Sequence, residues 1–259
     1  MEILEATSKP AKGNIILFHG LNNPPSLMNE LGEFLQKNGF NILIGSLSGH
    51  RGDSEKLKTL TKDDLVNDID QAVGCFTKKY PGLPLIYLGF SLGGTVGLAY
   101  AQKHPTVFSK ILLLAPAIEF RFFANLGRVL LPWKDTISIY SLASKRFNLY
   151  RWMPLNVYNA MIELRDGLYQ SAYENIEAPV LLLMHPKDEV VSFHRIRKTV
   201  REYKLPWKTI GFEHPTKSVR HLVAIPSLMG EKNLAVFQRE VLAFLHKKTV
   251  LLPQDDQHD

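Results

Sequence analysis

Short, fully apolar runs alternate with longer amphipathic segments along most of the chain. The apolar runs lie at residues 14–18, 40–44, 85–90, 111–114, 180–184 and 207–212. Uniformly apolar runs of this length are typical of strands that are buried on both faces. Their repeated alternation with helical segments predicts an α/β fold, in which helices cover both faces of a mostly parallel sheet.

The intervening segments carry signals of helix ends. Ser26 is a candidate N-cap for a helix that runs to about Asn38 and stops at Gly39. The sequence Thr61-Lys62-Asp63-Asp64 resembles a capping box, with Asp in place of the usual Glu or Gln. Apolar residues at helical spacing follow it. Further helices are predicted at about residues 92–104, 193–204 and 234–247.

The alternation stops between about residues 118 and 176, where the composition becomes aromatic and basic. We interpret this stretch as an inserted cap on one edge of the domain. Residues 1–117 and 177–251 then form the core, and the polar tail at 252–259 is expected to be disordered.

A candidate nucleophile lies where the third apolar run meets a predicted helix. Residues 89–94 read Gly-Phe-Ser-Leu-Gly-Gly, which contains the pattern G-x-S-x-G. A serine in a sharp strand-to-helix turn presents its hydroxyl above the sheet, and the turn requires small neighbours. Ser91 is therefore the candidate nucleophile.

A serine hydroxyl needs a base within hydrogen-bond reach and an acid that orients the base. These partners are expected in loops at the carboxyl ends of later strands, in the order serine, acid, histidine. Asp188 and Glu189 follow the run at 180–184, and His214 and His221 follow the last run. We favour Asp188 and His221, with Glu189 and His214 as the alternatives.

The negative charge that develops during acyl transfer needs two backbone N–H donors. One is expected from Leu92, which follows the nucleophile and opens a helix whose dipole adds to the effect. The second is expected from Leu21, in the loop after the first apolar run. His19 is interpreted as a residue that shapes this loop.

Composition limits the remaining possibilities. The chain has 259 residues, and no apolar run approaches the roughly 20 residues that span a bilayer. The acidic N-terminus does not resemble a secretory signal, and Cys75 is the only cysteine. No cysteine and histidine cluster has zinc-ligand spacing. We therefore expect a cytoplasmic protein without a metal or another cofactor.

The net charge of +6 comes largely from one basic segment. Its residues are Arg195, Arg197, Lys198, Arg201, Lys204 and Lys208. The simpler interpretation is a solvated helix face, and the alternative is weak attraction to an anionic membrane surface or an acidic substrate. No nucleic-acid-binding motif accompanies the charge, so nucleic acid is not an expected partner.

Together these motifs resemble the α/β-hydrolase superfamily, and most closely its carboxylesterase and monoacylglycerol-lipase branch. The resemblance rests on His19-Gly20-Leu21, the loop at 49–54, the elbow at 89–94, Asp188 and His221. It implies a triad of Ser91, His221 and Asp188, and a cap that shapes an acyl pocket.

The chain departs from this pattern in several places. Asn22-Asn23 replaces the glycine run of some lipases, and Asp53 stands where some relatives carry glycine. Phe90 before the serine argues against the proline iminopeptidase branch. A serine at the elbow argues against haloalkane dehalogenase and epoxide hydrolase chemistry.

The function expected from this resemblance is hydrolysis of esters that carry an apolar acyl group. The expected substrates are medium-chain acyl esters or monoacylglycerols. Phe122, Trp133 and Trp152 are candidates for the wall of the acyl pocket, although aromatic residues also serve as core. An acyl thioesterase would use the same catalytic residues. A non-catalytic lipid- or partner-binding protein of the same fold is the alternative from another class.

Overall fold

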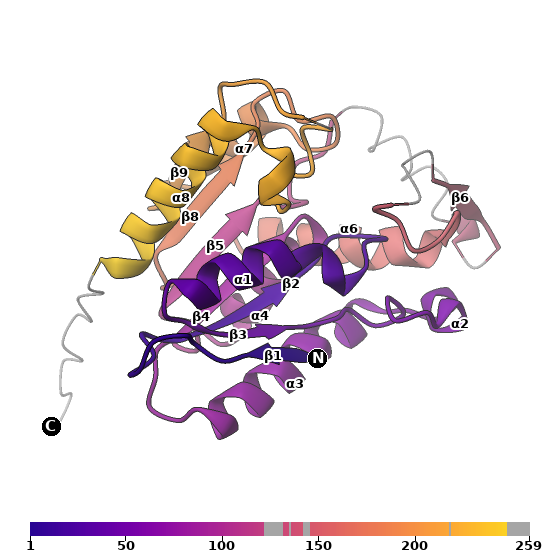
Figure 1. The fold of residues 1–259 in the computed structure, drawn as a ribbon. Coiled ribbons are helices and arrows are strands. Elements are labelled where there is room, and N and C mark those ends of the chain that lie inside the picture. The colour runs from indigo at the N-terminus through magenta and orange to yellow at the C-terminus, as the bar shows by residue number, and fades with distance from the viewer. Residues whose placement is uncertain (122–131, 135, 142–145, 218, 248–259) are drawn as a thin grey trace, which may run out of the picture.

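The computed structural model describes residues 1–121, 132–134, 136–141, 146–217 and 219–247. Its centre is a seven-stranded sheet in the order β1-β3-β2-β4-β5-β8-β9, which is parallel except for β1 against β3 (Figure 1). The strands are β1 Glu2–Leu4, β2 Asn14–Phe18, β3 Asn41–Ile44, β4 Leu85–Phe90, β5 Lys110–Leu114, β8 Val180–Met184 and β9 Lys208–Gly211. Every residue of the central strands β2, β4, β5 and β8 is buried, as their apolar sequences predict.

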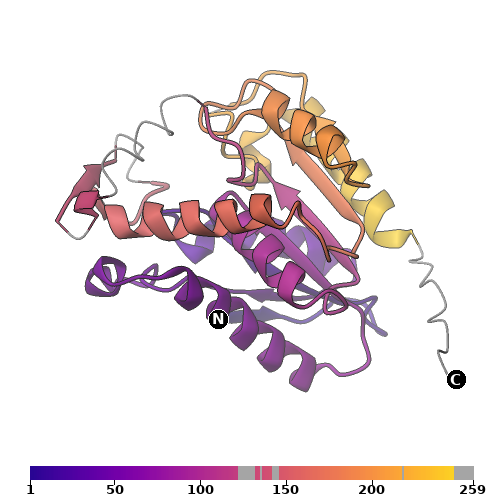
Figure 2. The ribbon, with the colours of Figure 1, turned by 180° about the vertical axis from the view of Figure 1, so that it is seen from behind.

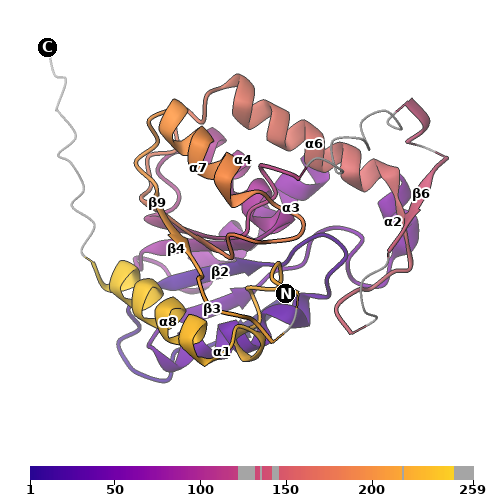
Figure 3. The ribbon, with the colours of Figure 1, turned by 90° about the horizontal axis from the view of Figure 1, so that it is seen from above.

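Helices cover both faces of the sheet. The helices are α1 Asn29–Lys37, α2 Ser54–Lys58, α3 Lys62–Lys79, α4 Leu92–Lys103, α6 Leu155–Gln170, α7 Phe193–Glu202 and α8 Glu231–His246, with short 3-10 turns η1 Pro25–Met28 and η3 Pro226–Leu228. Seen from above, α1 and α8 lie on one side of the sheet and α3, α4 and α7 lie on the other (Figure 3). The result is a three-layered α/β architecture.

Two helix ends test the capping predictions. The capping box is confirmed, because the Thr61 side chain accepts from the Asp64 N–H and the Asp64 side chain accepts from the Thr61 N–H. The predicted Ser26 cap is wrong: residues 25–28 form a 3-10 turn, and α1 begins at Asn29 without a side-chain cap. Proline at the first position of that turn favours this early start, because its fixed φ suits a helical residue and it has no N–H to satisfy.

The insert contains regular structure that the sequence did not predict. Strands β6 Ser138–Tyr140 and β7 Trp152–Pro154 form an antiparallel pair, and α6 follows directly. Helix α6 packs across α4, and the β6–β7 pair lies beyond the carboxyl end of the parallel strands (Figure 2). The division into a core and a cap at residues 118–176 stays a prediction, and the tail at 252–259 lies outside the described residues.

Candidate active site

Ser91 forms the junction between β4 and α4. Its backbone adopts φ 50° and ψ −114°, which a residue with a Cβ rarely populates. Hydrogen bonds hold this conformation from both sides, because the Ser91 N–H donates to Leu114 O at 2.9 Å and the Ala117 N–H donates to Ser91 O at 3.1 Å. Such a conformation costs about 1–3 kcal/mol and persists where neighbours fix it. Ser91 is 6% exposed, so its hydroxyl lies in a largely enclosed site.

Two glycines make room for this turn. A Cβ on Gly89 would lie 2.5 Å from the Gly94 nitrogen, and a Cβ on Gly93 would lie 2.5 Å from Phe18 O. Both obstacles are backbone atoms, which cannot move aside as a flexible side chain can. The sequence pattern around Ser91 is therefore a packing requirement of this junction.

The Gly93→Ala variant is expected to lose about 3 kcal/mol or more of unfolding free energy, because the new methyl overlaps the β2 backbone. Gly74→Ala is the matched control, since Gly74 lies exposed within α3 and a Cβ there meets nothing within 4 Å. The control should gain about 0.5–1 kcal/mol from the better helix propensity of alanine. Urea unfolding of both variants measures the difference, and equal stabilities would contradict this account of the junction.

His221 connects Ser91 to a buried carboxylate. Its Nε2 lies 3.1 Å from Ser91 Oγ, and its Nδ1 lies 2.8 Å from Asp188 Oδ2. Asp188 is fully buried, and its Oδ1 accepts the N–H groups of Val190 and Val191 at 2.8 Å each. Because an ionised carboxylate only accepts, Nδ1 of the neutral imidazole carries the proton and Nε2 presents a lone pair to the serine.

Glu189, the alternative acid, makes a different set of contacts. Its two carboxylate oxygens accept the backbone N–H groups of Arg220 and His221 at 3.2 and 3.1 Å, and Arg220 Nη1 donates to it at 3.0 Å. The neighbouring carboxylates therefore hold one histidine in two ways: Asp188 orients the imidazole ring, and Glu189 fixes the backbone that carries it.

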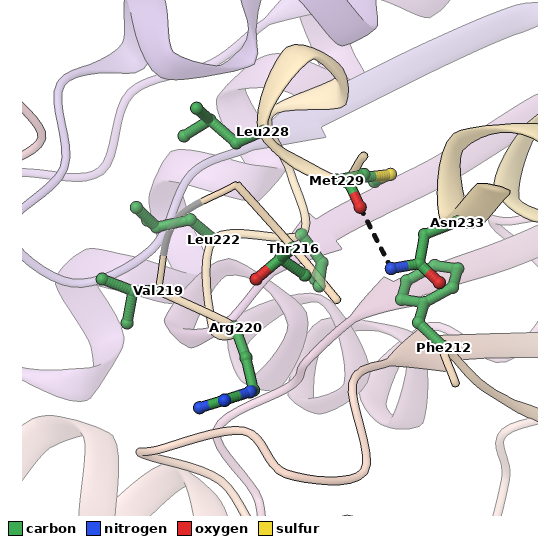
Figure 4. Close-up of a pocket in the computed structure, with 9 residues that line it drawn as sticks. Phe212, Thr216, Val219, Arg220, Leu222, Leu228, Met229 and Asn233 are labelled. Atoms are coloured by element: carbon green, nitrogen blue, oxygen red, sulfur yellow. Dashed lines mark hydrogen bonds between the residues drawn. The ribbon is translucent and has the colours of Figure 1, made fainter. Parts of the chain in front are cut away.

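The alternative base, His214, lies in an exposed part of the same loop between β9 and η3. The side chain of Asn233 on α8 binds the backbone of His214. Its Oδ1 accepts the His214 N–H at 3.1 Å, and its Nδ2 donates to His214 O at 2.7 Å. Figure 4 shows Asn233 also donating to Met229 O at 3.0 Å, beside a hollow lined by Leu222 and Leu228 under the loop. The loop that carries His221 is thus anchored near its start, at His214, by Asn233 and at His221 itself by Glu189.

Substitution of the two carboxylates should separate their contributions. Asp188→Asn is expected to lower kcat by about 10⁴-fold, because an amide favours the wrong imidazole tautomer. Glu189→Gln removes one acceptor for a backbone N–H and is expected to cost only about fivefold. Ester hydrolysis rates of the two variants make the comparison, and a larger loss for Glu189→Gln would contradict this assignment.

The loop after β2 passes directly beside Ser91, since a Cβ on Gly20 would lie 3.0 Å from the Ser91 Cβ. The carbonyl of Gly20 is held by His19 Nδ1 at 2.8 Å and by the Asn23 N–H at 3.2 Å. Because C=O and N–H point in opposite directions in a trans peptide, these bonds also orient the N–H of Leu21. The N–H of Leu92, at the first position of α4, has no acceptor within its own helix. Oxyanion binding by these two amides stays a prediction.

Two buried neutral histidines support this loop. Burial lowers the pKa of His19 to about 3 and the pKa of His50 to about 4. His19 Nε2 accepts the Leu47 N–H at 3.2 Å, and His50 Nε2 accepts the Asn22 N–H at 3.0 Å. The other ring nitrogen of each histidine lies against a carbonyl oxygen, so both rings carry their proton on Nδ1. The sequence interpretation of His19 as a loop-shaping residue agrees with these contacts, whereas the sequence analysis named His50 only as part of the loop at 49–54 and predicted no role for it.

The depressed pKa of His50 predicts loss of stability in mild acid. The unfolded chain binds protons near the ordinary value of 6.5 and the folded chain only near 4, so unfolding takes up a proton between these values. The unfolding free energy should therefore fall as the pH drops, by about 2 kcal/mol for this group from pH 7 to pH 5. His50→Gln should show a smaller fall in urea titrations at the two pH values; an unchanged pH dependence would contradict this linkage.

Two of the three cap residues named from sequence are exposed in the described part of the structure. Trp133 and Trp152 are 56% and 60% exposed, and Trp152 packs edge-on against Tyr140 at 5.1 Å between ring centroids. Phe122 lies outside the described residues. A role of these side chains in acyl binding stays a prediction.

Residues 9–214 match the family described as serine aminopeptidase, S33, which is most of the chain and includes Ser91 and Asp188. The chain belongs to this family. His221 lies just beyond the matched residues, so its assignment to the site rests on the distances given above.

Individual family relatives are similar over a shorter stretch. Monoglyceride lipase of Rattus norvegicus is 31% identical over 109 residues, which are 41% of this chain and 36% of that protein. The thermostable monoacylglycerol lipase of a Bacillus species is 28% identical over 93 residues, 36% of each chain. These sequence matches therefore span little more than a third of either relative.

Solved structures of lipases are similar over nearly the whole chain. A soluble variant of monoglyceride lipase from Saccharomyces cerevisiae superimposes with a TM-score of 0.77 at 17% identity, covering 96% of this chain and 91% of that chain. This similarity concerns the fold. The α/β-hydrolase fold predicted from the sequence is confirmed.

Proposed function

We propose that this member of the family is a serine hydrolase of carboxylic esters, with monoacylglycerols or other medium-chain acyl esters as substrates. The observation that carries the proposal is the unbroken chain of contacts from Ser91 Oγ through both nitrogens of His221 to Asp188, at 3.1 and 2.8 Å. A serine, an imidazole and a buried carboxylate in this order are the parts required for acyl transfer.

In the proposed reaction, His221 Nε2 takes the Ser91 proton while Oγ bonds to the ester carbonyl carbon. The N–H groups of Leu21 and Leu92 hold the resulting oxyanion. The imidazolium then returns its proton to the leaving alcohol as the ester C–O bond breaks, which leaves an acyl-serine. Water repeats the sequence and releases the carboxylic acid. Asp188 stabilises the imidazolium throughout and stays ionised.

Monoacylglycerols as substrates are supported by the relatives named as monoglyceride and monoacylglycerol lipases, and the medium acyl length is part of the proposal. A series of nitrophenyl esters and 1-monoacylglycerols of increasing chain length tests it, with Ser91→Ala as the blank. The proposal predicts the highest kcat/KM at medium chain length. A strong preference for acetate would contradict an apolar acyl pocket, and faster cleavage of matched acyl-CoA would favour a thioesterase.

We also propose that the protein makes a weak contact with anionic membrane surfaces through the basic side chains of α7. Arg197, Lys198 and Arg201 are exposed on α7, although Lys198 also pairs with Glu202 at 3.5 Å. Among the described residues, no helix is both long and apolar enough to cross a membrane. Co-sedimentation with anionic and with neutral vesicles tests the contact; equal binding to both would contradict an electrostatic origin.

A further inference from the structure

Asn22 joins three segments that are distant in sequence. Its backbone N–H donates to His50 Nε2 at 3.0 Å, and its backbone carbonyl accepts the Leu149 N–H at 2.9 Å. Its side-chain Oδ1 accepts the Tyr150 N–H at 2.9 Å, and Nδ2 donates to Tyr150 O at 2.8 Å. All four polar groups of this one residue are thus used, and Asn22 is only 6% exposed.

The segment at 147–150, within the predicted cap, is held by this loop at further points. Asn23 Nδ2 donates to Phe147 O at 2.7 Å, and the Tyr150 hydroxyl donates to Gly49 O at 2.7 Å. Segment 147–150 is therefore fastened both to the turn after β2 and to the loop that carries His50. A change in the position of this segment must be transmitted to the turn or break several partly buried hydrogen bonds.

The turn held in this way contains the proposed oxyanion donor. Leu21 immediately precedes Asn22. The Leu21 N–H shares a peptide group with the Gly20 carbonyl, and that carbonyl accepts from the Asn23 N–H at 3.2 Å. Asn22 and Asn23, which bind segment 147–150, therefore also determine the backbone geometry around the Leu21 N–H. Displacement of a catalytic donor by a fraction of an ångström weakens its interaction with the transition state more than substrate binding.

We propose that Asn22 is a positioning residue that couples segment 147–150 of the cap to the oxyanion-binding amide of Leu21. This inference rests on the proposed function. It assigns a purpose to the Asn22-Asn23 pair, which replaces the glycine run of some lipases. A glycine-rich turn has no side chains with which to bind the cap, whereas asparagine combines such a side chain with tolerance of the positive φ found here, 59°.

The backbone conformation provides a clean test variant. Asn22→Gly keeps a residue that adopts φ 59° without strain, together with the backbone bonds to His50 and Leu149, and removes both side-chain bonds to Tyr150. Asn159→Ala is the matched control: the Asn159 side chain donates to Glu163 within α6, in the predicted cap but outside segment 147–150.

The experiment measures kcat and KM for a medium-chain nitrophenyl ester, and the inhibition constant of a trifluoromethyl ketone that forms a tetrahedral adduct with the serine. Asn22→Gly is expected to lower kcat by about 10- to 100-fold with a much smaller change in KM, since loss of a whole oxyanion donor costs about 10²- to 10³-fold. Its inhibition constant should rise in parallel with the fall in kcat/KM. Asn159→Ala should leave kcat and the inhibition constant close to those of the wild type.

Two results would overturn the inference. An Asn22→Gly variant with wild-type kcat and a raised KM would show that the bonds between Asn22 and Tyr150 order only the cap and do not position the Leu21 amide. Equal losses in Asn22→Gly and Asn159→Ala would show a general effect of loosening the cap. Failure of the proposed function is distinguishable from both, because the wild-type protein itself would then neither hydrolyse the ester nor react with the ketone.

Discussion

Ser91→Ala is expected to lower kcat for ester hydrolysis by about a million-fold and to leave the fold unchanged. The variant lacks the oxygen that forms the acyl-enzyme, and no other residue can supply it at the same position above β4. Stability should be retained, because alanine keeps the Cβ of Ser91 in the same backbone conformation and the hydrogen bonds to Leu114 and Ala117 involve backbone atoms only.

The measurement is the hydrolysis rate of a nitrophenyl ester with purified variant, alongside a thermal unfolding curve. Matching unfolding curves establish that the lost activity reflects chemistry. Residual turnover within about tenfold of the wild type would mean that Ser91 does not form the acyl-enzyme, because loss of a nucleophile costs far more than that.

His221→Ala and His214→Ala should differ by several orders of magnitude. Removal of His221 leaves Ser91 without a base and should cost about as much as removal of the serine itself. His214 is exposed and is held through its backbone by Asn233, contacts that alanine preserves. The His214→Ala variant should therefore keep kcat within about twofold of the wild type.

The two variants are compared under identical conditions, with fluorescence or circular dichroism as a check on folding. An inactive His214→Ala protein beside an active His221→Ala protein would reverse the assignment of the base. Loss of activity in both, with folding intact, would mean that the loop acts as one unit and that neither histidine can be singled out by substitution.

The central strands and the elbow could be predicted because their signals are local. Fully apolar runs predict the buried strands, and Ser91, with a glycine two residues away on each side, predicts the junction that follows β4. The long helix α6 was missed although its buried residues recur at helical spacing, because the aromatic and basic composition around it obscured the period. The buried residues of α6 that show this spacing include Val157, Ala160, Met161, Leu164 and Leu168. Strand β1 has three residues at the sheet edge, too few for a pattern.

The sequence restricted the catalytic acid to two neighbouring residues but could not show which of them contacts the histidine. The order of motifs restricts the acid to Asp188 or Glu189, but both are carboxylates, and what separates them is mainly the direction in which each side chain leaves the backbone. That direction is set by the turn after β8, in which the Val190 and Val191 amides hold the Asp188 carboxylate. The contact between Asn22 and Tyr150 spans 128 residues, and no local pattern encodes it.

Labelling with a fluorophosphonate, followed by peptide mapping, tests the central claim most directly. The reagent phosphonylates only a serine that is activated by a neighbouring base and oxyanion site. We predict one adduct per folded chain, on Ser91, which is abolished by Ser91→Ala or by prior unfolding. A folded protein that carries no adduct on Ser91, or carries it on another residue, would contradict the assignment of this chain as a serine hydrolase acting through Ser91.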